Sequence, residues 1–537
     1  MLIRDLGNVP LSEGVDCDIC IVGSGPAGAT LARELAGNDM RVLLLESGGI
    51  GGQAEADALS EIENVGAPRV IDQSVVRPRV LGGTSGIWTG RCAPFDEIDF
   101  EPRSWVPHSG WPIGLDELTP FLDRSASHLG LGAGSGFTQA GPPSRSKPAP
   151  CHPEIDPRIL RPFFWQFSRD AVKRADSMRF GPRLLAEKAD NVRVITNASV
   201  THINTNATAS SVESVEVAGL NGEHRTVTAP MVVLCAGGIE NARLLLASNR
   251  VVPAGLGNGH DIVGRFLMDH PRGGVATFDH TRAAALNPYL RMQLTRIGGG
   301  TYLFCKGLRL SPEVQEREEL LNCAVWLSEM VMDDDPWSAL KRMLRGQGRL
   351  GQDSRAILSN PGLLAQGVRG VFTGDVIPRK LEGLELNCTV EQRPDLDSRV
   401  TLSDRMDRNG TPLSRVHWRV NEHEQHTVRR TAGLVVQELA RLGVPAPVLE
   451  GWVRDVAPFP PSFRDVAHHI GTTRMSLHPQ DGVVDTDCQV HHVQGLYVAG
   501  SSVFPTAGHA NPTQMIVALA VRLADTLKRR TNTGGKP

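Results

Sequence analysis

The sequence predicts an α/β fold in which a Rossmann-like dinucleotide-binding domain is interleaved with a second domain built on an antiparallel sheet with helices. Three observations lead to this fold class. Buried strands at 18–22 and 41–45 flank a glycine turn and a helix. A further buried strand at 231–235 again ends on glycines and opens a helix. The segment 276–450 instead mixes strands, helices and proline-rich turns, which we interpret as a separate sheet covered by helices.

The first glycine turn has the spacing of a dinucleotide-binding motif. Gly23 permits the tight turn, Gly25 lets the backbone approach a pyrophosphate, and Gly28 lets the helix pack closely on the strand. The helix N-terminus is then expected to face the phosphates with free N–H groups and a positive dipole end. Glu46 closes the second strand, where an acid accepts hydrogen bonds from a ribose 2′-OH. This acid favours FAD or NAD over NADP.

A second glycine-rich segment follows, with four glycines between Gly82 and Gly90. Such a segment buries its backbone against something flat or forms an anion-binding nest of N–H groups. A flexible loop is the alternative, but it fits poorly with the embedded Ile87 and Trp88. At Gly237, as in the first turn, glycine follows a buried strand and opens a helix. We therefore expect both turns to contact the same ligand.

Composition narrows the class of protein. With 537 residues the chain is too long for one ordinary core, so two or more domains are expected. A formal net charge of −3 gives no electrostatic case for binding nucleic acid or a membrane surface. No run approaches the roughly 20 apolar residues that span a bilayer. The N-terminus lacks the apolar core of a signal peptide, and a cytoplasmic protein is expected.

The cysteines and paired histidines predict neither a redox nor a metal site. The nine cysteines are scattered and form no disulfide framework. Cys17 and Cys20 have C-x-x-C spacing, but they lie before and within a strand, where neighbouring side chains diverge, so a dithiol role is disfavoured. His491 and His492 lack cysteine or acidic partners at ligand spacing, and no metal site is expected.

Near the C-terminus, polar residues crowd loops around a buried strand at 496–500. His468 to Met475 precede this strand, and His509 to Thr513 follow it and open an amphipathic helix. Loops between a buried strand and a helix N-terminus are where open α/β sheets bind ligands. Asn511 is expected to cap the last helix, with Pro512 at its first position. Another helix is predicted at 338–350.

Four blocks of the sequence resemble the glucose–methanol–choline (GMC) family of flavin oxidoreductases. They are Ile21 to Glu46, Leu81 to Arg91, Ala236 to Leu246 and His468 to Leu523, in the order that the family shows. The C-terminal block is most similar to the bacterial sugar dehydrogenases and pyranose oxidases. The resemblance implies FAD as cofactor, an alcohol or sugar hydroxyl as substrate, and O₂ or another molecule as electron acceptor.

The resemblance also assigns roles to residues. The family's catalytic histidine, three residues before a Gly-Thr pair, matches His468, and its second catalytic position matches Asn511. Pyranose oxidases carry a flavin-linked histidine in the block that corresponds here to Thr84–Trp88, which has none, so the FAD is expected to be non-covalent. The residues expected at the cofactor are Gly23, Gly25, Pro26, Ala27, Gly28, Glu46, Ser47, Arg79, Gly83, Thr84, Ser85, Trp88, Val200, Ala236, Gly237, Gly500, Ser501, Asn511, Pro512 and Thr513.

Alcohol oxidation removes a proton from oxygen and a hydride from carbon. A neutral imidazole, with an unperturbed pKa of about 6.5, is suited to take the proton. We expect His468 to be this base and Asn511 to orient the substrate C–H at the flavin N5. His469 is the nearest competitor. His509 is expected to line the pocket or pack beneath the flavin, and His270 is interpreted as structural.

The leading hypothesis is FAD-dependent oxidation of an alcohol group on a sugar, aminosugar, glycoside or related polyol. A flavoprotein lyase without net redox and a non-catalytic flavin-binding protein are the alternatives. Residues 1–120, 190–275 and 451–537 are expected to form the FAD-binding domain. Residues 121–189 are assigned to the substrate domain or a lid, and 276–450 to the substrate-binding domain. The oligomeric state stays open.

Overall fold

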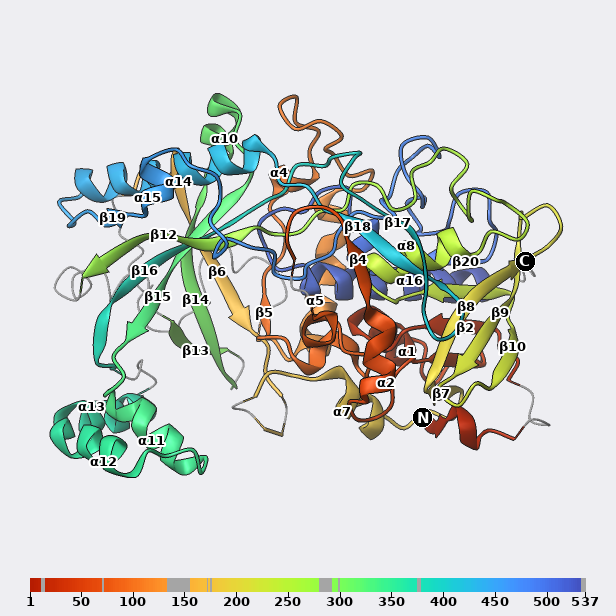
Figure 1. Ribbon diagram of the computed structural model, residues 1–537, viewed down its shortest axis with the longest axis horizontal. Coiled ribbons are helices and arrows are strands. Elements are labelled where there is room, and N and C mark those ends of the chain that lie inside the picture. The colour runs from red at the N-terminus through yellow and green to blue at the C-terminus, as the bar shows by residue number, and fades with distance from the viewer. Residues whose placement is uncertain are drawn as a thin grey trace.

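The computed structural model describes residues 1–10, 15–69, 72–132, 155–170, 172–173, 176–279, 292–297, 300–373 and 378–532. Residues 133–154, which belong to the segment assigned to the substrate domain or a lid, lie outside this description. Two large sheets dominate the fold, a parallel one and an antiparallel one, and they lie side by side in the molecule (Figure 1). The mixed α/β class with a Rossmann-like unit and antiparallel sheets is confirmed.

The parallel sheet is assembled from segments that are far apart in the chain. In spatial order its strands are β1 (Leu2–Asp5), β7 (Val192–Thr196), β3 (Val42–Leu45), β2 (Ile19–Val22), β11 (Met231–Leu234) and β20 (Leu496–Val498). All neighbours run parallel. The four strands β2, β3, β11 and β20 are buried throughout, which explains their continuous apolar sequences.

Helices cover this sheet. Helix α1 (Pro26–Glu34) packs against α16 (Thr513–Asn532), which in turn packs against α5 (Leu115–Leu129). Helix α8 (Gly238–Ala247) follows β11, and α7 (Phe180–Ala186) contacts α1. The short elements near them are η1 (Leu6–Asn8), α2 (Ala54–Asp57), η2 (Ala58–Ser60), α3 (Gln73–Val76), η3 (Gly83–Gly86), α4 (Glu97–Phe100) and η4 (Ser501–Val503).

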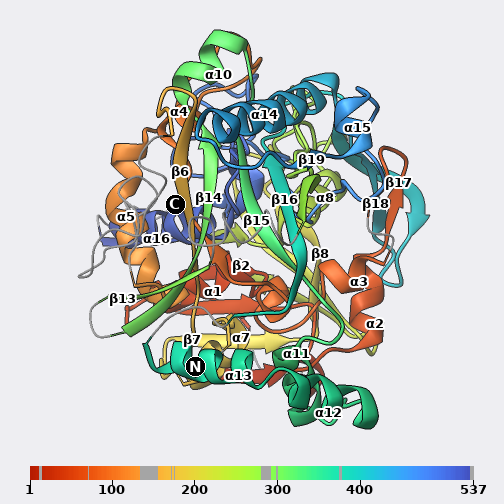
Figure 2. The same cartoon turned by 90° about the vertical axis from the view of Figure 1, so that its left-hand side faces the viewer.

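The antiparallel sheet forms the other half of the molecule (Figures 1 and 2). Its order is β19 (Val448–Leu449), β12 (Arg272–Asp279), β16 (Leu381–Val390), β15 (Cys323–Val331), β14 (Gly300–Leu310), β6 (Leu160–Phe167) and β5 (Arg91–Cys92), with β13 (Gln293–Ile297) paired to β14. One face packs on α14 (Glu422–Arg441). On the other, Trp165 and Trp326 join the hydrophobic core of the parallel sheet. This sheet therefore has a polar and aromatic boundary with the Rossmann-like unit.

Two small sheets connect these parts. One consists of β8 (Ala198–Thr205), β9 (Val212–Gly219) and β10 (His224–Thr228), and the other of β17 (Arg399–Met406), β18 (Pro412–His417) and β4 (Ile62–Asn64). Strands β17 and β18 contact α8. The segment 62–64, early in the chain, is thereby fixed beside the edge of the cofactor-binding region. Two short helices, α10 (Pro312–Glu318) and α15 (Gly451–Arg454), lie outside these sheets.

The helix predicted at 338–350 is wrong in its bounds. The structure has α11 (Pro336–Leu344), α12 (Leu350–Ser359) and α13 (Pro361–Thr373) below the antiparallel sheet in Figure 1. Asp335 caps the first helix by accepting a hydrogen bond from the Ser338 N–H, with Pro336 at the first position. Gly346 adopts a φ of 72°, which only glycine takes without strain, so the chain turns there.

No helix in the described part of the chain is long and apolar enough to cross a membrane. The eight described cysteines are all buried free thiols, Cys17 and Cys20 included. Among the described residues no group of three or more histidine, cysteine, aspartate or glutamate side chains has the geometry to hold a metal ion.

Candidate active site

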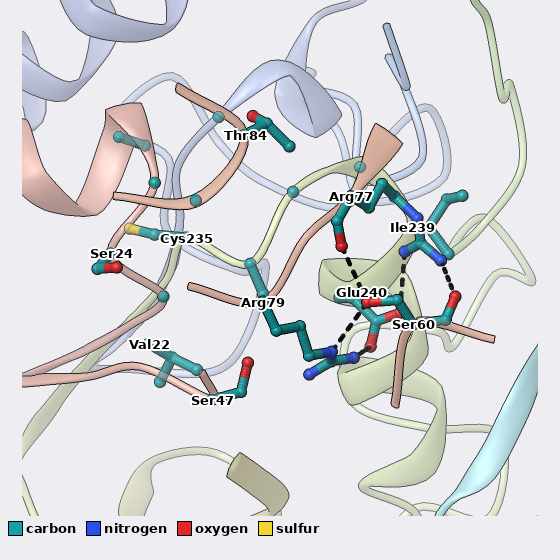
Figure 3. A pocket seen from close by; sticks show the side chains of 18 of the residues that line it. Val22, Ser24, Ser47, Ser60, Arg77, Arg79, Thr84, Cys235, Ile239 and Glu240 are labelled. Carbon is teal, nitrogen blue, oxygen red and sulfur yellow. Dashed lines mark hydrogen bonds and ion pairs between the residues drawn. The ribbon is translucent and has the colours of Figure 1, made fainter. Parts of the chain in front are cut away.

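A cavity lies at the carboxyl edge of the parallel sheet, where Rossmann-like folds bind nucleotides. It holds about 1480 Å³ of empty space, open solvent at its mouth included. The glycine turn after β2, the strand ends at Glu46 and Ala236, and the loop at Gly500 form its walls. Figure 3 shows these strand ends converging, with Val22, Ser24 and Cys235 around one end of the cavity.

The three glycines of the first turn differ in what their geometry requires. Gly23 has a φ of 100°, and a Cβ there would lie 2.7 Å from the Cys235 carbonyl oxygen. A Cβ on Gly28 would lie 1.9 Å from the Gly23 carbonyl oxygen. A Cβ on Gly25 would meet no atom within 4 Å. Gly23 and Gly28 are therefore required by packing, whereas Gly25 leaves open space at the uncapped N-terminus of α1.

Glu46 is buried and lines the cavity. One carboxylate oxygen accepts hydrogen bonds from the Ser24 N–H at 2.9 Å and the Ser24 hydroxyl at 2.5 Å. The other accepts from the Gly48 N–H at 2.9 Å. Glu46 thus fixes the glycine turn to the end of β3. The Ser47 hydroxyl donates a fourth, longer hydrogen bond of 3.4 Å to the second oxygen, and this is the contact that a ligand hydroxyl could most easily replace.

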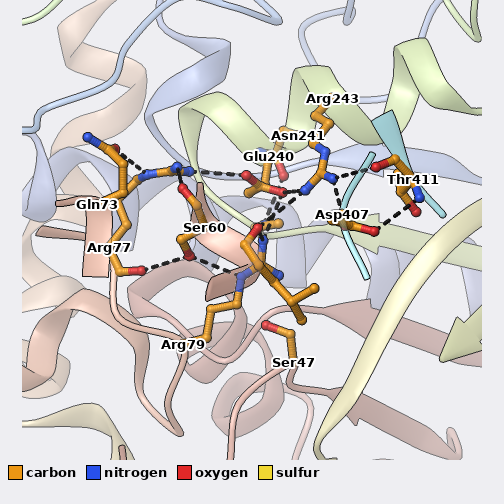
Figure 4. Close-up of polar contacts among 12 residues, drawn as sticks. Ser47, Ser60, Gln73, Arg77, Arg79, Glu240, Asn241, Arg243, Asp407 and Thr411 are labelled. Atoms are coloured by element: carbon orange, nitrogen blue, oxygen red, sulfur yellow. Dashed lines mark hydrogen bonds and ion pairs between the residues drawn. The ribbon is translucent and has the colours of Figure 1, made fainter. Parts of the chain in front are cut away.

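An arginine cluster around Glu240 lines the cavity, and sequence reasoning found only Arg79 of its members. Arg77, Arg79 and Arg243 each place a guanidinium nitrogen 3.1 Å from the Glu240 carboxylate (Figures 3 and 4). Arg243 also pairs with Asp407 at 2.7 Å. Burial alone would raise the pKa of Glu240, but the three guanidiniums hold it well below its ordinary value.

This cluster joins three segments: the stretch after α3, the first turn of α8, and the loop between β17 and β18. Arg79 also bonds the Ser60 hydroxyl at 3.0 Å, as Figure 4 shows. The two closely spaced arginines at 77 and 79 were visible in the sequence. Their shared partner was not, because it lies more than 160 residues further along the chain.

His468 lines the cavity and faces a second histidine. Its Nδ1 lies 2.9 Å from Nδ1 of His270, which is completely buried. The other ring nitrogen of His270, Nε2, lies 2.9 Å from the carbonyl oxygen of Gly508 and 3.2 Å from that of Ala507. Carbonyl oxygens only accept, so Nε2 of His270 carries the proton.

The hydrogen bonds then assign the tautomer of His468. With its proton on Nε2, a neutral His270 presents Nδ1 as an acceptor. His468 must therefore donate from Nδ1, which leaves its Nε2 as an unprotonated acceptor. Burial lowers the pKa of His468 well below 6.5, and His270 lowers it further, against the opposing effect of Asp269. His468 is thus a neutral imidazole at neutral pH.

Asp269 holds the loop that carries His468. Its Oδ1 accepts hydrogen bonds from the backbone N–H groups of His270 at 2.7 Å, His468 at 3.1 Å and Val466 at 3.2 Å. Its Oδ2 lies 2.6 Å from Arg69. Burial would raise the pKa of Asp269, but Arg69 and the neighbouring histidines keep it well below its ordinary value. A permanently ionised carboxylate therefore fixes the position of both histidines.

Asn511 lies beside the base, with its Nδ2 3.4 Å from Nε2 of His468. The predicted capping role is wrong, because its buried Oδ1 has no hydrogen-bond partner in the described structure. Helix α16 begins at Thr513, so Pro512 immediately precedes it rather than occupying its first position. The amide is therefore positioned beside His468 with an acceptor oxygen to spare.

The other two candidate histidines lie apart from this pair. His469 lines the cavity, and its backbone packs so tightly on α8 that a Cβ on Gly238 would lie 2.3 Å from its carbonyl oxygen. His509 is buried against the antiparallel sheet, with its ring 4.4 Å from that of Phe163. Neither ring nitrogen of His509 has a hydrogen-bond partner in the described structure.

The structure gathers most of the predicted cofactor residues around the cavity. Those that line it are Gly23, Gly25, Pro26, Ala27, Glu46, Ser47, Arg79, Gly83, Thr84, Val200, Ala236, Gly237, Gly500, Ser501, Pro512 and Thr513. Gly28, Ser85, Trp88 and Asn511 are not part of its lining. The Ser85 hydroxyl donates to the Gly82 carbonyl at 2.7 Å, and the Trp88 indole donates to the Met178 carbonyl at 2.8 Å. These two side chains hold the glycine-rich segment in place.

Comparison with known proteins agrees with the resemblance seen in the sequence. Models of the GMC oxidoreductase family match residues 173–272 and 394–520, and a model of the NAD(P)-binding Rossmann-like domain matches 21–70. The fructose dehydrogenase large subunit of Gluconobacter japonicus is 24% identical, covering 96% of this chain and 98% of the relative. The 6'''-hydroxyparomomycin C oxidase of Streptomyces lividus is 25% identical, covering 94% and 90%.

Two further matches extend this picture. A C-glycoside 3-oxidase of Microbacterium trichothecenolyticum is 25% identical, covering 94% of this chain and 95% of the relative. The crystal structure of pyridoxine 4-oxidase from Mesorbium loti has a TM-score of 0.57 and 17% identity, covering 96% and 99%, a likeness of fold. From its family domains and its fold, the chain belongs to the GMC oxidoreductase family of FAD-dependent enzymes.

Proposed function

We propose that this enzyme oxidises a hydroxyl group of a sugar, aminosugar, glycoside or related polyol, with His468 as the base. The proposal depends above all on the tautomer of His468, which leaves an unprotonated Nε2 on a residue of the cavity wall. The names of relatives that cover nearly the whole chain, a fructose dehydrogenase and a C-glycoside 3-oxidase, support the substrate class.

The residues of the cavity fit the cofactor of the family. The open space at Gly25 and the uncapped start of α1 suit a pyrophosphate, and Glu46 suits a ribose hydroxyl. The strand ends at Val200 and Ala236 complete the walls for the adenosine part. When bound, FAD supplies the acceptor for the hydride of the alcohol. The segment Thr84–Trp88, where pyranose oxidases carry the flavin-linked histidine, contains no histidine. We therefore expect a non-covalent cofactor that acid precipitation releases into the supernatant.

His468 accepts the proton of the substrate hydroxyl in the proposed reaction. Its Nε2 is free to accept the proton of a substrate hydroxyl, and base catalysis of this kind contributes typically 10²–10⁴-fold. Asn511, beside the same nitrogen, donates a hydrogen bond to the substrate oxygen and orients it. His270 and Asp269 act through His468, the first by setting its tautomer and the second by holding its backbone, and are positioning residues.

The test is anaerobic reduction of the bound flavin by a panel of sugars and glycosides, followed by its absorbance band. The variant His468→Ala is expected to retain its yellow colour and lose about 10²–10⁴-fold of the reduction rate. His469→Ala tests the competing base and is expected to lose far less. The exposed His260→Ala serves as control. An unchanged rate in His468→Ala contradicts its role, and turnover without bleaching indicates a lyase instead.

A further inference from the structure

Two arginines meet over one tryptophan on the face of the antiparallel sheet that borders the cofactor-binding unit. The guanidinium carbon of Arg91, on β5, lies 5.2 Å from the ring centre of Trp326 on β15. The guanidinium carbon of Arg272, on β12, lies at the same 5.2 Å from that ring. Arg91 also lies 5.7 Å from the ring of Trp165 on β6. Side chains from four strands thus place two positive charges beside the ring of Trp326.

These two charges have no carboxylate partner. In the described part of the chain neither guanidinium forms a hydrogen bond or an ion pair with another residue. Burial, together with the charge of Arg91, lowers the pKa of Arg272 to about 10. Asp269 is near enough to oppose this effect, but its oxygens are already engaged by Arg69 and three backbone N–H groups.

Most of the other buried arginines in the described chain pair with carboxylates; the exception is Arg474, which lies over the ring of Phe266 and donates to the His108 carbonyl. Arg103 binds Glu391 through two hydrogen bonds of 2.7 and 2.5 Å, and Arg69 binds Asp269. Buried cations without a partner cost several kcal/mol, so a folded protein rarely places two of them side by side. Arg272 nevertheless keeps part of its surface accessible. Its terminal guanidinium nitrogens are therefore not fully buried, and an anion can reach them.

Several N–H donors near the arginines have no hydrogen-bond partner in the described structure. The indole Nε1 of Trp165, which is 0% exposed, has no hydrogen-bond partner, nor has Nε1 of Trp326, which is 4% exposed. Nε of Arg272 has none either. Indole and guanidinium N–H groups cannot accept hydrogen bonds. The indole nitrogens and Nε of Arg272 are inaccessible, so the donors that an anion can reach are the other guanidinium nitrogens of Arg91 and Arg272.

This donor cluster adjoins the proposed base. Arg272 follows His270 by two positions in the chain, and its charge is among the causes that lower the pKa of both His270 and His468. The ring of His509 lies 6.5 Å from that of Trp165 and closes the same region. A group bound at Arg91 and Arg272 would therefore be part of the substrate whose hydroxyl reaches His468.

We propose that the substrate carries a carboxylate, as an acidic sugar or a glycoside with a uronate group does, and that Arg91 and Arg272 bind it beside the ring of Trp326. Guanidinium groups bind the two oxygens of a carboxylate in a planar, bidentate manner. The carboxylate undergoes no chemistry. The inference rests on the proposed function and narrows it, because the same charges repel the ammonium groups of an aminosugar.

The test compares molecules that share one ring and differ in charge. Methyl β-D-glucuronide, methyl β-D-glucoside and glucose 6-phosphate are offered to the holoenzyme, and the concentration that half-saturates anaerobic flavin reduction is measured. The uronide is expected to saturate at roughly 10- to 100-fold lower concentration than the neutral glucoside, the range that hydrogen bonds to a charged group provide. Equal saturation by the two overturns the inference, and preference for the phosphate overturns the assignment of a carboxylate.

Variants identify the residues. Arg272→Gln and Arg91→Gln are each expected to remove most of the preference for the uronide, measured as the ratio of the half-saturating concentrations of glucoside and uronide in the same variant. Arg272→Lys keeps the positive charge but not the planar guanidinium. Its preference for the uronide is expected to lie between that of the unaltered enzyme and that of Arg272→Gln. The exposed Arg158→Gln is the matched control. If both Gln variants still prefer the uronide over the neutral glucoside, Arg91 and Arg272 do not form the carboxylate site.

A second measurement separates this inference from the proposed function. D-glucuronate is expected to raise the melting temperature of the holoenzyme, in proportion to its occupancy, more than D-glucose does. Arg272→Gln should abolish the difference. If no carbohydrate reduces the flavin yet glucuronate still stabilises the protein through Arg272, the anion site stands and the proposed function falls. If neutral and acidic sugars reduce the flavin equally well, the proposed function stands and the anion site falls.

Discussion

Nδ1 of His270 and Nδ1 of His468 lie 2.9 Å apart, and a single proton joins them. The carbonyl oxygens of Ala507 and Gly508 keep the proton of His270 on Nε2, so the shared proton belongs to His468. This arrangement differs from a histidine oriented by a carboxylate, because the partner is neutral. It fixes the tautomer of His468 without adding a negative charge that would raise the pKa of the base.

Removing the acceptor on His270 should therefore slow the reaction through His468. In His270→Phe the Nδ1–H of His468 loses its partner, and the other tautomer, with a proton on Nε2, becomes accessible. We expect the rate of flavin reduction to fall about 10²-fold at saturating substrate, with little change in the half-saturating concentration.

The matched variant is His270→Gln, whose side-chain oxygen can still accept a hydrogen bond, and it should recover part of the loss. ¹⁵N spectra of histidine-labelled protein provide a readout apart from activity, since protonated and unprotonated ring nitrogens resonate differently. Equal rates in the Phe and Gln variants would show that the acceptor on residue 270 has no role in setting the tautomer.

The pH profile follows from the same pair. Burial and His270 lower the pKa of His468, so the base is neutral and active from pH 6.5 upwards. The rate of flavin reduction should be flat between pH 7 and 9 and fall only on the acid side, as His468 becomes protonated. In His270→Gln the positive charge on His468 is opposed less, so the acid limb should move to higher pH. An acid limb above pH 7 in the unaltered enzyme is incompatible with a base of lowered pKa.

Two glycines of the first turn should respond differently to the same change. Gly25→Ala introduces a methyl group where no protein atom lies within 4 Å, so the apoprotein should fold with an unchanged melting temperature. That methyl group occupies the space expected for the pyrophosphate, and the purified protein should be colourless. Gly28→Ala places a Cβ 1.9 Å from the Gly23 carbonyl oxygen and should destabilise the fold itself.

Gly51→Ala is the control, since its Cβ also meets nothing within 4 Å and the residue is exposed. The measurements are flavin absorbance per protein and thermal unfolding of the apoprotein. Full FAD content in Gly25→Ala would mean that the pyrophosphate does not approach this turn.

Glu240 should be needed for both stability and cofactor retention. Replacing it with Gln leaves Arg77, Arg79 and Arg243 with only Asp407 for compensation, and removing one partner of a buried ion pair costs typically 3–5 kcal/mol. Thermal unfolding and the temperature of flavin release, read by fluorescence, should both fall. The exposed pair Arg405–Glu61 offers the control Glu61→Gln, expected to change the free energy of unfolding by less than about 1 kcal/mol.

Much of the fold could be predicted because its signals are local. The turn at Gly23–Gly28 and the apolar runs of β2, β3 and β11 can each be recognised from a few neighbouring residues. The site was harder, since its contacts join distant segments. His270 was interpreted as structural because the residues around it in the sequence give no sign of its contact with His468, which lies 198 residues further along the chain. For the same reason the partner of Arg79 escaped prediction.

The errors are of the same kind. Asn511 has the sequence position of a helix cap, yet the structure turns its amide to His468, a contact that local propensity cannot anticipate. The predicted helix at 338–350 begins inside α11 and runs through the turn at Gly346 to the first residue of α12, because its apolar spacing continues across that turn. In both places a tertiary contact or a backbone turn overrides a reasonable local preference.

The order of strands in the parallel sheet governs how this protein can be made. The edge strand β20 comes from residues 496–498 and pairs with β11, more than 250 residues before it. The loop at Gly500 and His468 come equally late, so one wall of the cavity is absent until nearly all of the described chain has been synthesised. Pairing across such separations is slow and leaves unfinished edges exposed. Flavin capture therefore belongs to the final stage of maturation, and a chain that stops short of residue 496 remains an aggregation-prone apoprotein.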